Sequence, residues 1–332
     1  IKIPDNNFLP LCVKRFLIIQ TAFLGDVILA TPVISELKRI YPESSIDVLV
    51  RKGNEALLDN NLSIQTVFTF DKKNKKYSSL NNLIKLIRSQ SYDEVINLHR
   101  FASSGFLTGF SKAKSKVGFD KNPLSFLYTK KIKHDLKSGL HEVERNLRCI
   151  KHHGTKEKKR PEIFPSDSDV EIVDPYTKDS YVCFAPASVW FTKQLPEDKW
   201  IELGKKWIKD HTVFLIGGPD DIKLCEKIAS VIDNPNCKSL AGKFTFLQSA
   251  ALFQRAKMNF VNDSGPLHIC SAVNAPVTAF FCSTTPSFGF GPLSDQSTIM
   301  ETKETLDCKP CGIHGYKSCP QGHFKCGKRI DL

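Results

Sequence analysis

The sequence lacks the long apolar runs that a membrane-spanning helix needs. No stretch approaches the roughly 20 consecutive apolar residues of a transmembrane helix. Residues 1–7 also lack the apolar core of a secretory signal peptide. We therefore expect a cytosolic protein, although the chain begins with Ile rather than Met and its natural start could lie upstream.

The sequence also has fewer acidic than basic residues. The 332 residues include 47 Lys and Arg against 35 Asp and Glu, which leaves a net charge of +12. Such an excess favours a polyanionic partner, and nucleic acid, an anionic membrane surface and phosphorylated substrates all fit it. The lysines form several loose clusters rather than one long tail, so scattered surface charge explains the excess as well.

No disulfide framework is evident over most of the chain. Seven of the eleven cysteines are scattered in apolar or helical contexts, as expected of reduced packing residues. The other four lie near the end with C-x2-C-x7-C-x6-C spacing: Cys308, Cys311, Cys319 and Cys326. Four thiols this close could hold a tetrahedral zinc ion, form two disulfides or pack as a reduced loop.

Short apolar strands alternate with helical patterns throughout the first half of the chain. Strands are expected at 15–21, 46–50, 66–70, 94–98, 117–119 and 127–132, and helices at 27–41, 79–90, 104–111 and 141–153. Alternation with short connections predicts a parallel sheet covered on both faces.

The second half repeats this alternation. Strands are expected at 181–185, 212–216, 239–242, 258–261 and 277–281, and helices at 196–209, 217–231, 246–256 and from about 265. Residues 154–179 are rich in Lys, Pro, Ser and Asp and show little periodicity, so we interpret them as a linker with the boundary near Asp174. The sequence thus predicts two Rossmann-like domains, 1–174 and 175–332, the second with a Cys-rich tail at 308–326.

The stretch 257–282 has the pattern strand, tight turn, helix, strand. Asp263, Ser264 and Gly265 supply turn and N-cap chemistry, and Pro266 fits a first helical turn, where its missing amide is harmless. The free amides and the dipole of such a helix start could hold a phosphate. An ordinary βαβ corner would have the same pattern.

Three side chains follow expected strand ends, where open α/β sheets bind their ligands. Asp26 could be a general base that deprotonates a hydroxyl, or merely a helix N-cap. A helix N-terminus stabilises the ionised carboxylate and so makes it a weaker base, unless burial opposes this effect. Lys193, just before the helix near Pro196, could neutralise a leaving diphosphate in place of a metal ion, or lie on the surface. His268 could donate to an anion or only pack.

Four motifs occur in the order found in the bacterial lipopolysaccharide heptosyltransferases, glycosyltransferase family 9, which the chain resembles over nearly its whole length. The motifs are Phe16–Pro32 with its Gly25-Asp26 turn, Lys193–Pro196, Ile216–Asp220 and Asn262–His268. The cysteine-rich ending resembles the heptosyltransferase II branch, which adds the second heptose of the inner core.

This resemblance implies a GT-B fold, with two Rossmann-like domains facing across a cleft, and inverting transfer of heptose from ADP-heptose without a required metal or other cofactor. The first domain would bind the acceptor and the second the nucleotide sugar. The base aspartate of the family matches Asp26, and its phosphate-binding lysine matches Lys193. The other matching positions would bind substrate: Gly25, Ser188, Asp220, Asp263, Ser264, Gly265, Pro266, Leu267 and His268.

The resemblance also implies partners and a location. The acceptor would be the lipid A-core. The protein would bind it at the inner face of the inner membrane, as a peripheral protein that contacts the anionic leaflet. No nucleic-acid partner is implied. One departure concerns the end of the chain. GT-B proteins usually end with a helix that crosses back to the first domain, whereas only residues 327–332 follow Cys326, so the chain is truncated or its tail replaces that helix.

Three alternatives remain open. The chain could be a GT-B transferase for another sugar nucleotide, because a few pocket contacts decide donor specificity. It could be a sugar-nucleotide epimerase of GT-B shape, which would need a second acid/base carboxylate in the cleft besides Asp263. A basic nucleic-acid-binding protein with a zinc-ribbon tail would explain the charge and the cysteines, but not two nucleotide-binding halves.

Overall fold

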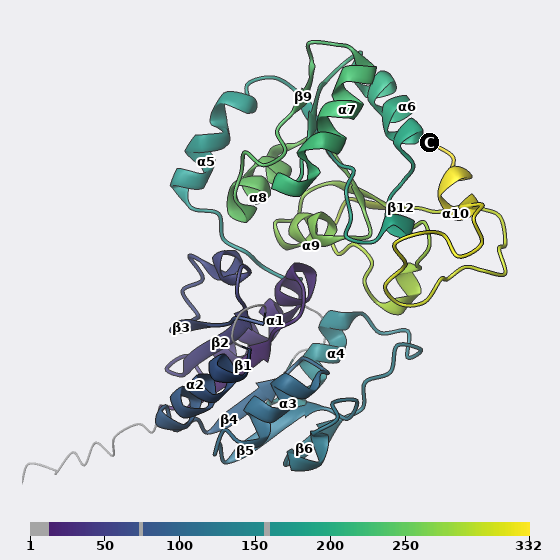
Figure 1. The fold of residues 1–332 in the computed structure, drawn as a ribbon. Coiled ribbons are helices and arrows are strands. Elements are labelled where there is room, and N and C mark those ends of the chain that lie inside the picture. Colours follow the sequence, from purple (N-terminus) through teal and green to yellow (C-terminus); the bar gives the residue numbers. More distant parts are fainter. Residues whose placement is uncertain (1–12, 73–75, 156–159) are drawn as a thin grey trace, which may run out of the picture.

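Each half of the chain folds around its own parallel sheet of six strands (Figure 1). The computed structural model describes residues 13–72, 76–155 and 160–332. Both sheets have the doubly wound Rossmann order, in which the chain starts at a central strand, moves to one edge and then fills the other side. The predicted α/β class with two Rossmann-like domains is therefore confirmed.

The first sheet has the order β3-β2-β1-β4-β5-β6, and all neighbouring strands are parallel. Its strands are β1 (Arg15–Gln20), β2 (Ser45–Arg51), β3 (Thr66–Phe70), β4 (Glu94–Asn97), β5 (Ser115–Phe119) and β6 (Lys130–Ile132). The helices of this domain are α1 (Leu24–Ile40), α2 (Lys76–Ser89), α3 (Ala102–Gly109) and α4 (Glu142–Arg148), with 3-10 turns η1 (Glu55–Leu58), η2 (Ser125–Leu127) and η3 (Lys151–His153).

The second sheet has the order β12-β11-β10-β7-β8-β9 and is also parallel. Its strands are β7 (Tyr181–Ala185), β8 (Thr212–Leu215), β9 (Cys237–Ser239), β10 (Met258–Asn262), β11 (Val277–Phe280) and β12 (Ser297–Met300). The helices are α5 (Asp167–Val173), α6 (Glu197–Trp207), α7 (Ile222–Ile232), α8 (Phe246–Arg255), α9 (Gly265–Ala272) and α10 (Lys325–Lys328), with 3-10 turns η4 (Asp174–Tyr176), η5 (Phe191–Lys193), η6 (Pro219–Asp221) and η7 (Pro286–Phe288).

Three elements of the second domain differ from the sequence-based expectations. The strand expected at 239–242 lies at 237–239, and β12 was not expected. Helix α5 lies inside the expected linker and packs on α8, so the second domain includes residues ahead of the expected boundary near Asp174. A capping box stabilises the start of α5, because Ser166 Oγ accepts from the Asp169 amide (3.2 Å) and Asp169 Oδ2 from the Ser166 amide (2.9 Å).

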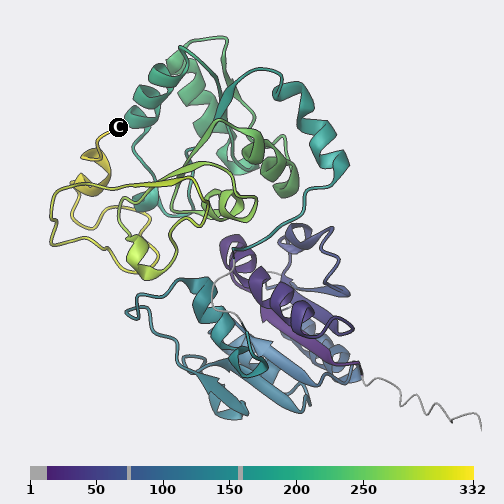
Figure 2. The same ribbon diagram turned by 180° about the vertical axis from the view of Figure 1, so that it is seen from behind.

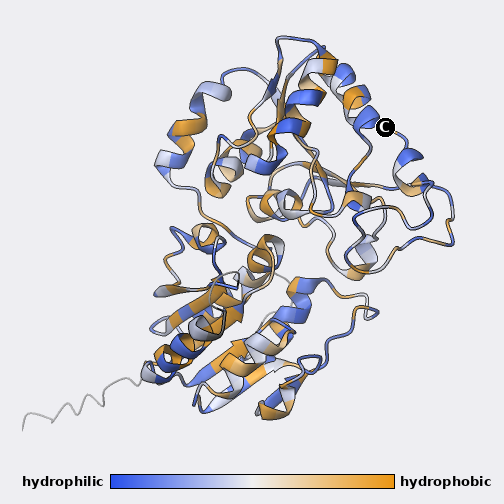
Figure 3. Cartoon of the chain, viewed as in Figure 1, coloured by the Kyte–Doolittle hydropathy of each residue, from blue (hydrophilic) through white to orange (hydrophobic). Residues whose placement is uncertain are grey.

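The two domains share one apolar core where α1 packs on α9 and η1 packs on α8. Buried side chains of β1 and α1, such as Phe16 and Val33, belong to the same cluster as Ala250 of α8 and Leu267 of α9. Figure 3 shows hydrophobic residues concentrated on the strands and on the inner faces of the helices. In the described part of the chain, no helix combines the length and the apolar character needed to cross a membrane.

The cysteine-rich tail stays with the second domain. Phe324, Cys326 and Ile330 are buried in the core cluster that also holds Trp200 of α6. Figures 1 and 2 show α10 and the end of the chain against this domain, on the side of α6. The described residues after Cys326 therefore form no helix that crosses to the first domain.

Candidate active site

The turn from β1 into α1 brings Asp26 to the junction between the domains. Helix α1 begins at Leu24, three residues earlier than expected, and Phe23 occupies its N-cap position. Asp26 is therefore the third helical residue and not the N-cap, and its Oδ2 accepts a hydrogen bond from the Phe23 amide at 3.2 Å. This bond fixes one carboxylate oxygen and leaves the other available for chemistry.

The surroundings of Asp26 make its carboxylate a stronger base. The pKa of Asp26 is raised from 3.8 to about 6, mainly by burial and in smaller part by the charge of Glu142. The hydrogen bond from Phe23 and the charge of Arg100 oppose this rise. Burial therefore outweighs the helix terminus, and Asp26 is ionised at neutral pH while keeping substantial proton affinity.

Glu142 belongs to a buried charge network that the sequence did not indicate. Arg145 Nε donates to Glu142 Oε2 at 2.6 Å, and His134 Nε2 lies 3.4 Å from the same carboxylate. Although burial raises the pKa of Glu142, hydrogen bonds from His134 and Arg145 bring it down to about 2. Glu142 is therefore a fixed negative charge, because it holds no proton near neutral pH.

This network also ties the two domains together. Arg145 Nη2 donates to the Phe288 carbonyl of the second domain at 2.6 Å, and the Glu142 amide donates to the Gly289 carbonyl at 2.8 Å. A helix was expected at 141–153, and α4 forms its first part. Glu142 and Arg145 of this helix are buried, because the 286–291 loop covers them.

In the second domain, Lys193 and Asp263 form an ion pair. Lys193 Nζ lies 2.7 Å from Asp263 Oδ2, and both side chains are largely buried. Thr284 Oγ1 also donates to Asp263 Oδ2 at 2.6 Å. Lys193 ends η5, and Asp263 follows β10, which is hydrogen-bonded to the central strand β7. The structure thus brings two predicted site residues into direct contact.

The predicted anion-binding turn is smaller than expected. Helix α9 begins at Gly265 with Ser264 as N-cap, as predicted. Pro266 has no amide hydrogen, and the Leu267 amide already donates to the Ser264 carbonyl at 3.1 Å. The Leu267 side chain is fully buried in the core. The amides of Ser264 and Gly265 are therefore the ones in this turn that could meet an anion.

The starts of α1 and α9 touch across the domain junction. A β-carbon on Gly25 would lie 2.5 Å from His268 Cδ2, and one on Gly265 would lie 2.7 Å from Leu24 Cδ2. Gly25 therefore has no room for a side chain against the buried ring of His268, whereas the tip of Leu24 could move away from a β-carbon at Gly265. Since α1 and α9 also pack on each other, the structure brings Asp26 and the Ser264 turn to one site.

His268 is buried at this junction and is neutral. Burial lowers its pKa to about 4, although the nearby charge of Asp263 raises it. Among the described residues, its Nδ1 atom has no hydrogen-bond partner. A neutral imidazole at this place can donate or accept one hydrogen bond with a bound substrate.

Two other predicted residues lie outside the Lys193 and Asp263 cluster. Ser188 follows β7 and is half-buried, and its carbonyl accepts from Gln194 Nε2 at 2.6 Å. Asp220 is exposed in η6, and it is Asp221 that accepts the Gly218 amide at 2.8 Å. The structure places both at carboxyl ends of central strands, but neither belongs to the Lys193 and Asp263 cluster.

The cysteine-rich tail reaches the site through residues 311–316. The Tyr316 amide donates to Thr192 Oγ1 at 2.7 Å, next to Lys193, and Gly315 packs against Lys193 Cγ. Desolvation lowers the pKa of His314, and the charges of Lys193 in the second domain and Arg100 in the first add to this effect. The tail thus helps to hold Lys193 in place.

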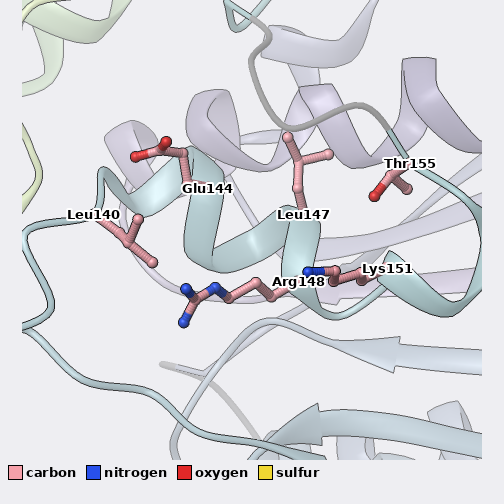
Figure 4. A pocket seen from close by; sticks show the side chains of 6 residues that line it. All are labelled: Leu140, Glu144, Leu147, Arg148, Lys151 and Thr155. Atoms are coloured by element: carbon pink, nitrogen blue, oxygen red, sulfur yellow. The ribbon is translucent and has the colours of Figure 1, made fainter.

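A cavity of about 520 Å³ opens between this tail and the first domain. Its lining combines cations and apolar side chains with two histidines and a carboxylate: Arg100, Phe101, Lys121, His134, Asp135, Leu136, Lys137, Ile313 and His314. Arg100 also lies close enough to Asp26 to lower its pKa. Arg100 thus acts on Asp26 and also lines this cavity, whose cations suit an anionic molecule. A second hollow, of about 50 Å³, runs along α4 beside Arg148 and contains none of the predicted residues (Figure 4).

The four tail cysteines gather but do not form a tight ligand set. Burial raises the pKa of Cys326 to about 11, with smaller contributions from Cys311, Cys319 and Cys308, so all four thiols lie near one another. All cysteines within the described ranges are free thiols, which excludes the two-disulfide alternative there. The potential metal ligands that do lie close together within those ranges belong to another group. Its members are Glu94, His152 and His153, whose ligand atoms all lie within 4.8 Å of one another.

Comparison with known proteins agrees with this arrangement. Residues 80–315 match the family described as glycosyltransferase family 9 (heptosyltransferase). The chain is 29% identical to lipopolysaccharide heptosyltransferase 3 of Escherichia coli over 277 residues, which cover 79% of this chain and 82% of that protein. It is 24% identical to lipooligosaccharide heptosyltransferase 2 of Haemophilus influenzae, with 87% and 89% covered.

Solved structures show the same fold. A glycosyltransferase family 9 protein from Veillonella parvula superposes with a TM-score of 0.78 at 22% identity, covering 86% of this chain and 85% of that one. ADP-heptose lipopolysaccharide heptosyltransferase II of E. coli gives a TM-score of 0.77 at 20% identity, covering 90% and 95%. These likenesses confirm the predicted GT-B fold.

Proposed function

We propose that this chain, which belongs to glycosyltransferase family 9, the heptosyltransferases, transfers heptose from ADP-heptose to the inner core of lipopolysaccharide with inversion at the anomeric carbon. Membership of the family makes it a glycosyltransferase. The observation that carries the finer proposal is the contact between Gly25 and His268, which holds the start of α1, with Asp26, against α9, whose first turn follows Asp263, the partner of Lys193.

In this mechanism Asp26 is the general base. The acceptor hydroxyl gives its proton to the Asp26 carboxylate while its oxygen attacks the anomeric carbon from the side opposite the diphosphate. The bond from that carbon to the diphosphate oxygen breaks, and ADP leaves with the electron pair. A pKa of about 6 suits this step, because the carboxylate is free of protons at neutral pH but still attracts one.

Lys193 and the start of α9 receive the departing ADP. Lys193 carries the positive charge that neutralises the diphosphate, so no metal ion is required at this step. Its ion pair with Asp263 holds the ammonium group in place before the substrate binds. The amides of Ser264 and Gly265 complete the anion site, and neutral His268 supplies one further hydrogen bond.

The acceptor would enter through the cavity beside Arg100. Lys121, Lys137 and Arg100 would meet the anionic groups of a lipid A-core acceptor, and Phe101 would stack on a sugar ring. The lysine-rich surface of this domain would then contact the anionic inner leaflet from the cytoplasmic side. Liposome binding should weaken as salt increases, and binding that is independent of salt would count against this contact.

An epimerase is not favoured by the site. It would need a second carboxylate able to exchange protons, and the nearest candidate, Glu142, has a pKa of about 2 and is held by Arg145. Asp263 is bound to Lys193 and Thr284. The nucleic-acid-binding alternative loses its support, because a family of enzymes accounts for the chain over residues 80–315.

The proposal is tested by product analysis. Purified protein, ADP-heptose and a heptose-deficient core acceptor should yield a product that is one heptose heavier, together with free ADP. GDP-sugars and UDP-sugars serve as controls for donor specificity. If a different nucleotide sugar is consumed and ADP-heptose is not, the donor assignment is wrong while the transferase fold still stands.

A further inference from the structure

Three potential metal ligands meet at the end of the first sheet that faces away from the active site. Glu94 is the first residue of β4, so it lies at the amino end of this parallel strand. His152 and His153 end η3, the turn that follows α4. Asp26 and Arg100 lie beyond the opposite, carboxyl ends of the strands. The cluster is therefore separate from the chemistry proposed above.

The spacing of the three side chains fits a small metal ion. His152 Nε2 lies 3.2 Å from Glu94 Oε2, and His153 Nε2 lies 3.2 Å from Glu94 Oε1. All the ligand atoms are within 4.8 Å of one another. In a tetrahedral zinc site with bonds of about 2.0–2.2 Å, neighbouring ligand atoms are roughly 3.3–3.6 Å apart. The two histidine–carboxylate pairs already have nearly this spacing, and the two imidazole nitrogens need to approach each other by at most about 1.5 Å for an ion to bind.

A second polar contact orients one of the ligands. Tyr41 Oη lies 3.0 Å from His153 Nδ1, on the side of the ring opposite Glu94. Metal binding through Nε2 requires the proton of a neutral imidazole to sit on Nδ1, and the Tyr41 oxygen can accept it there. Outer partners of this kind fix the ring and the tautomer in metal sites. The rings of Phe16 and Tyr41 also pack edge-on against His153.

Burial leaves the cluster one open side. The side chains of Glu94 and His153 are 7% and 9% exposed, whereas that of His152 is 26% exposed. An ion can therefore enter beside His152 and keep a water molecule as its fourth ligand. Without an ion, the same atoms can pair as two imidazoles donating to one carboxylate. The two states differ in whether Nε2 carries a proton or a metal.

We propose that Glu94, His152 and His153 form a binding site for a divalent transition metal of the zinc type. Two imidazoles and one carboxylate suit zinc, cobalt or nickel rather than magnesium or calcium, which prefer oxygen ligands. The ion links the start of β4 to η3. Through Tyr41, the C-cap of α1, it also supports the helix that carries Asp26 about 22 Å away near its other end.

Cobalt binding to the full chain tests this proposal, because cobalt reports its ligands. Cobalt bound by thiolates has an intense charge-transfer band, which separates any binding at the tail cysteines from binding by imidazole and carboxylate. The chain freed of metal should bind one cobalt equivalent without that band, and zinc should displace it. At a metal concentration about 100 times the dissociation constant, the ratio of folded to unfolded protein should rise about 100-fold. Magnesium should have no such effect.

Three variants sharpen the test. His152→Gln can still donate a hydrogen bond to Glu94 but lacks the ligand nitrogen. It should therefore not bind the cobalt equivalent that lacks the charge-transfer band, and cobalt should not stabilise its fold. Tyr41→Phe keeps all three ligands and should bind about 10 to 100 times more weakly. His211→Gln, which changes a histidine bonded to Ser180 in the second domain, should behave as wild type.

Two results would overturn the site. One is that the wild-type chain binds no cobalt, or binds cobalt only with the charge-transfer band of thiolate ligands. The other is that the His152→Gln variant, shown by circular dichroism to be folded, still binds one cobalt equivalent without the charge-transfer band. The proposal does not depend on the transferase mechanism, since neither readout measures activity.

Discussion

Replacement of Asp26 by Asn should stabilise the protein while abolishing most of its activity. The amide has the same shape and can still accept the hydrogen bond from the Phe23 amide, but it cannot take up a proton. Burial raises the pKa of Asp26 from 3.8 to about 6, so folding disfavours its ionised form by roughly 3 kcal/mol. Because the side chain is partly exposed, we expect Asp26→Asn to gain about 1–3 kcal/mol at neutral pH.

The gain should depend on pH in a defined way. Between pH 3.8 and about 6, the folded state binds a proton at Asp26 that the unfolded state does not bind, so stability from this group falls as the pH rises. The advantage of Asp26→Asn should be complete above about pH 6 and should fade toward pH 4. Urea unfolding of both proteins at several pH values measures this difference.

Activity should change in the opposite direction. Loss of a general base typically lowers the rate by about 10² to 10⁴-fold, so kcat/KM of Asp26→Asn should fall within this range. In the wild type, kcat/KM should increase through about pH 6 and then level off, because Asp26 must be ionised. Asp59→Asn, at an exposed position after η1, is the matched control and should change neither quantity. A variant at Asp26 with near wild-type kcat/KM would refute the role of this residue.

Three further changes have defined outcomes. Lys193→Gln removes the charge meant for the diphosphate and leaves Asp263 without its ion pair, so kcat should fall about 10² to 10³-fold and the melting temperature should drop. Gly25→Ala places a methyl group 2.5 Å from His268 Cδ2, so urea unfolding should show a loss of about 1–3 kcal/mol, and Gly25→Ala with His268→Ala should recover part of it. If the tail binds structural zinc, elemental analysis of Cys308→Ser should show one equivalent less than wild type, and equal zinc content would exclude a tail site that uses Cys308.

Much of the fold could be predicted from local patterns. Buried strands of parallel sheets are short continuous apolar runs, and both halves show them between helical stretches. Rossmann topology then brings the carboxyl ends of central strands to one edge, so Lys193, Asp263 and His268 could be expected near one another from their order alone. The roles of Asp26 and Lys193 remain predictions.

Other features depend on contacts between distant segments. Glu142 and Arg145 are buried only because the loop at 286–291, far away in the sequence, covers them. Burial is the main cause of the raised pKa of Asp26, and the charge of Glu142 adds to it. Helix α5, by contrast, had a local signal in the capping box of Ser166 and Asp169, hidden by the polar composition around it.

The way the domains meet leads to one more expectation, about nucleotide binding. Helices α1 and α9 begin in contact, at Gly25 with His268 and at Leu24 with Gly265. Each helix start carries roughly half a positive charge, so two of them at one place favour an anion more strongly than either would alone. Apolar packing between the domains keeps these two starts together before any ligand binds.

The diphosphate should therefore contribute more to binding than the nucleoside. ADP should raise the melting temperature more than AMP, and AMP more than adenosine, with the differences shrinking as salt increases. Lys193→Gln should reduce the shift caused by ADP and leave that of adenosine unchanged. If adenosine alone gave the full shift, the base and ribose would supply the affinity, and the convergence of α1, α9 and Lys193 on the diphosphate would have to be given up.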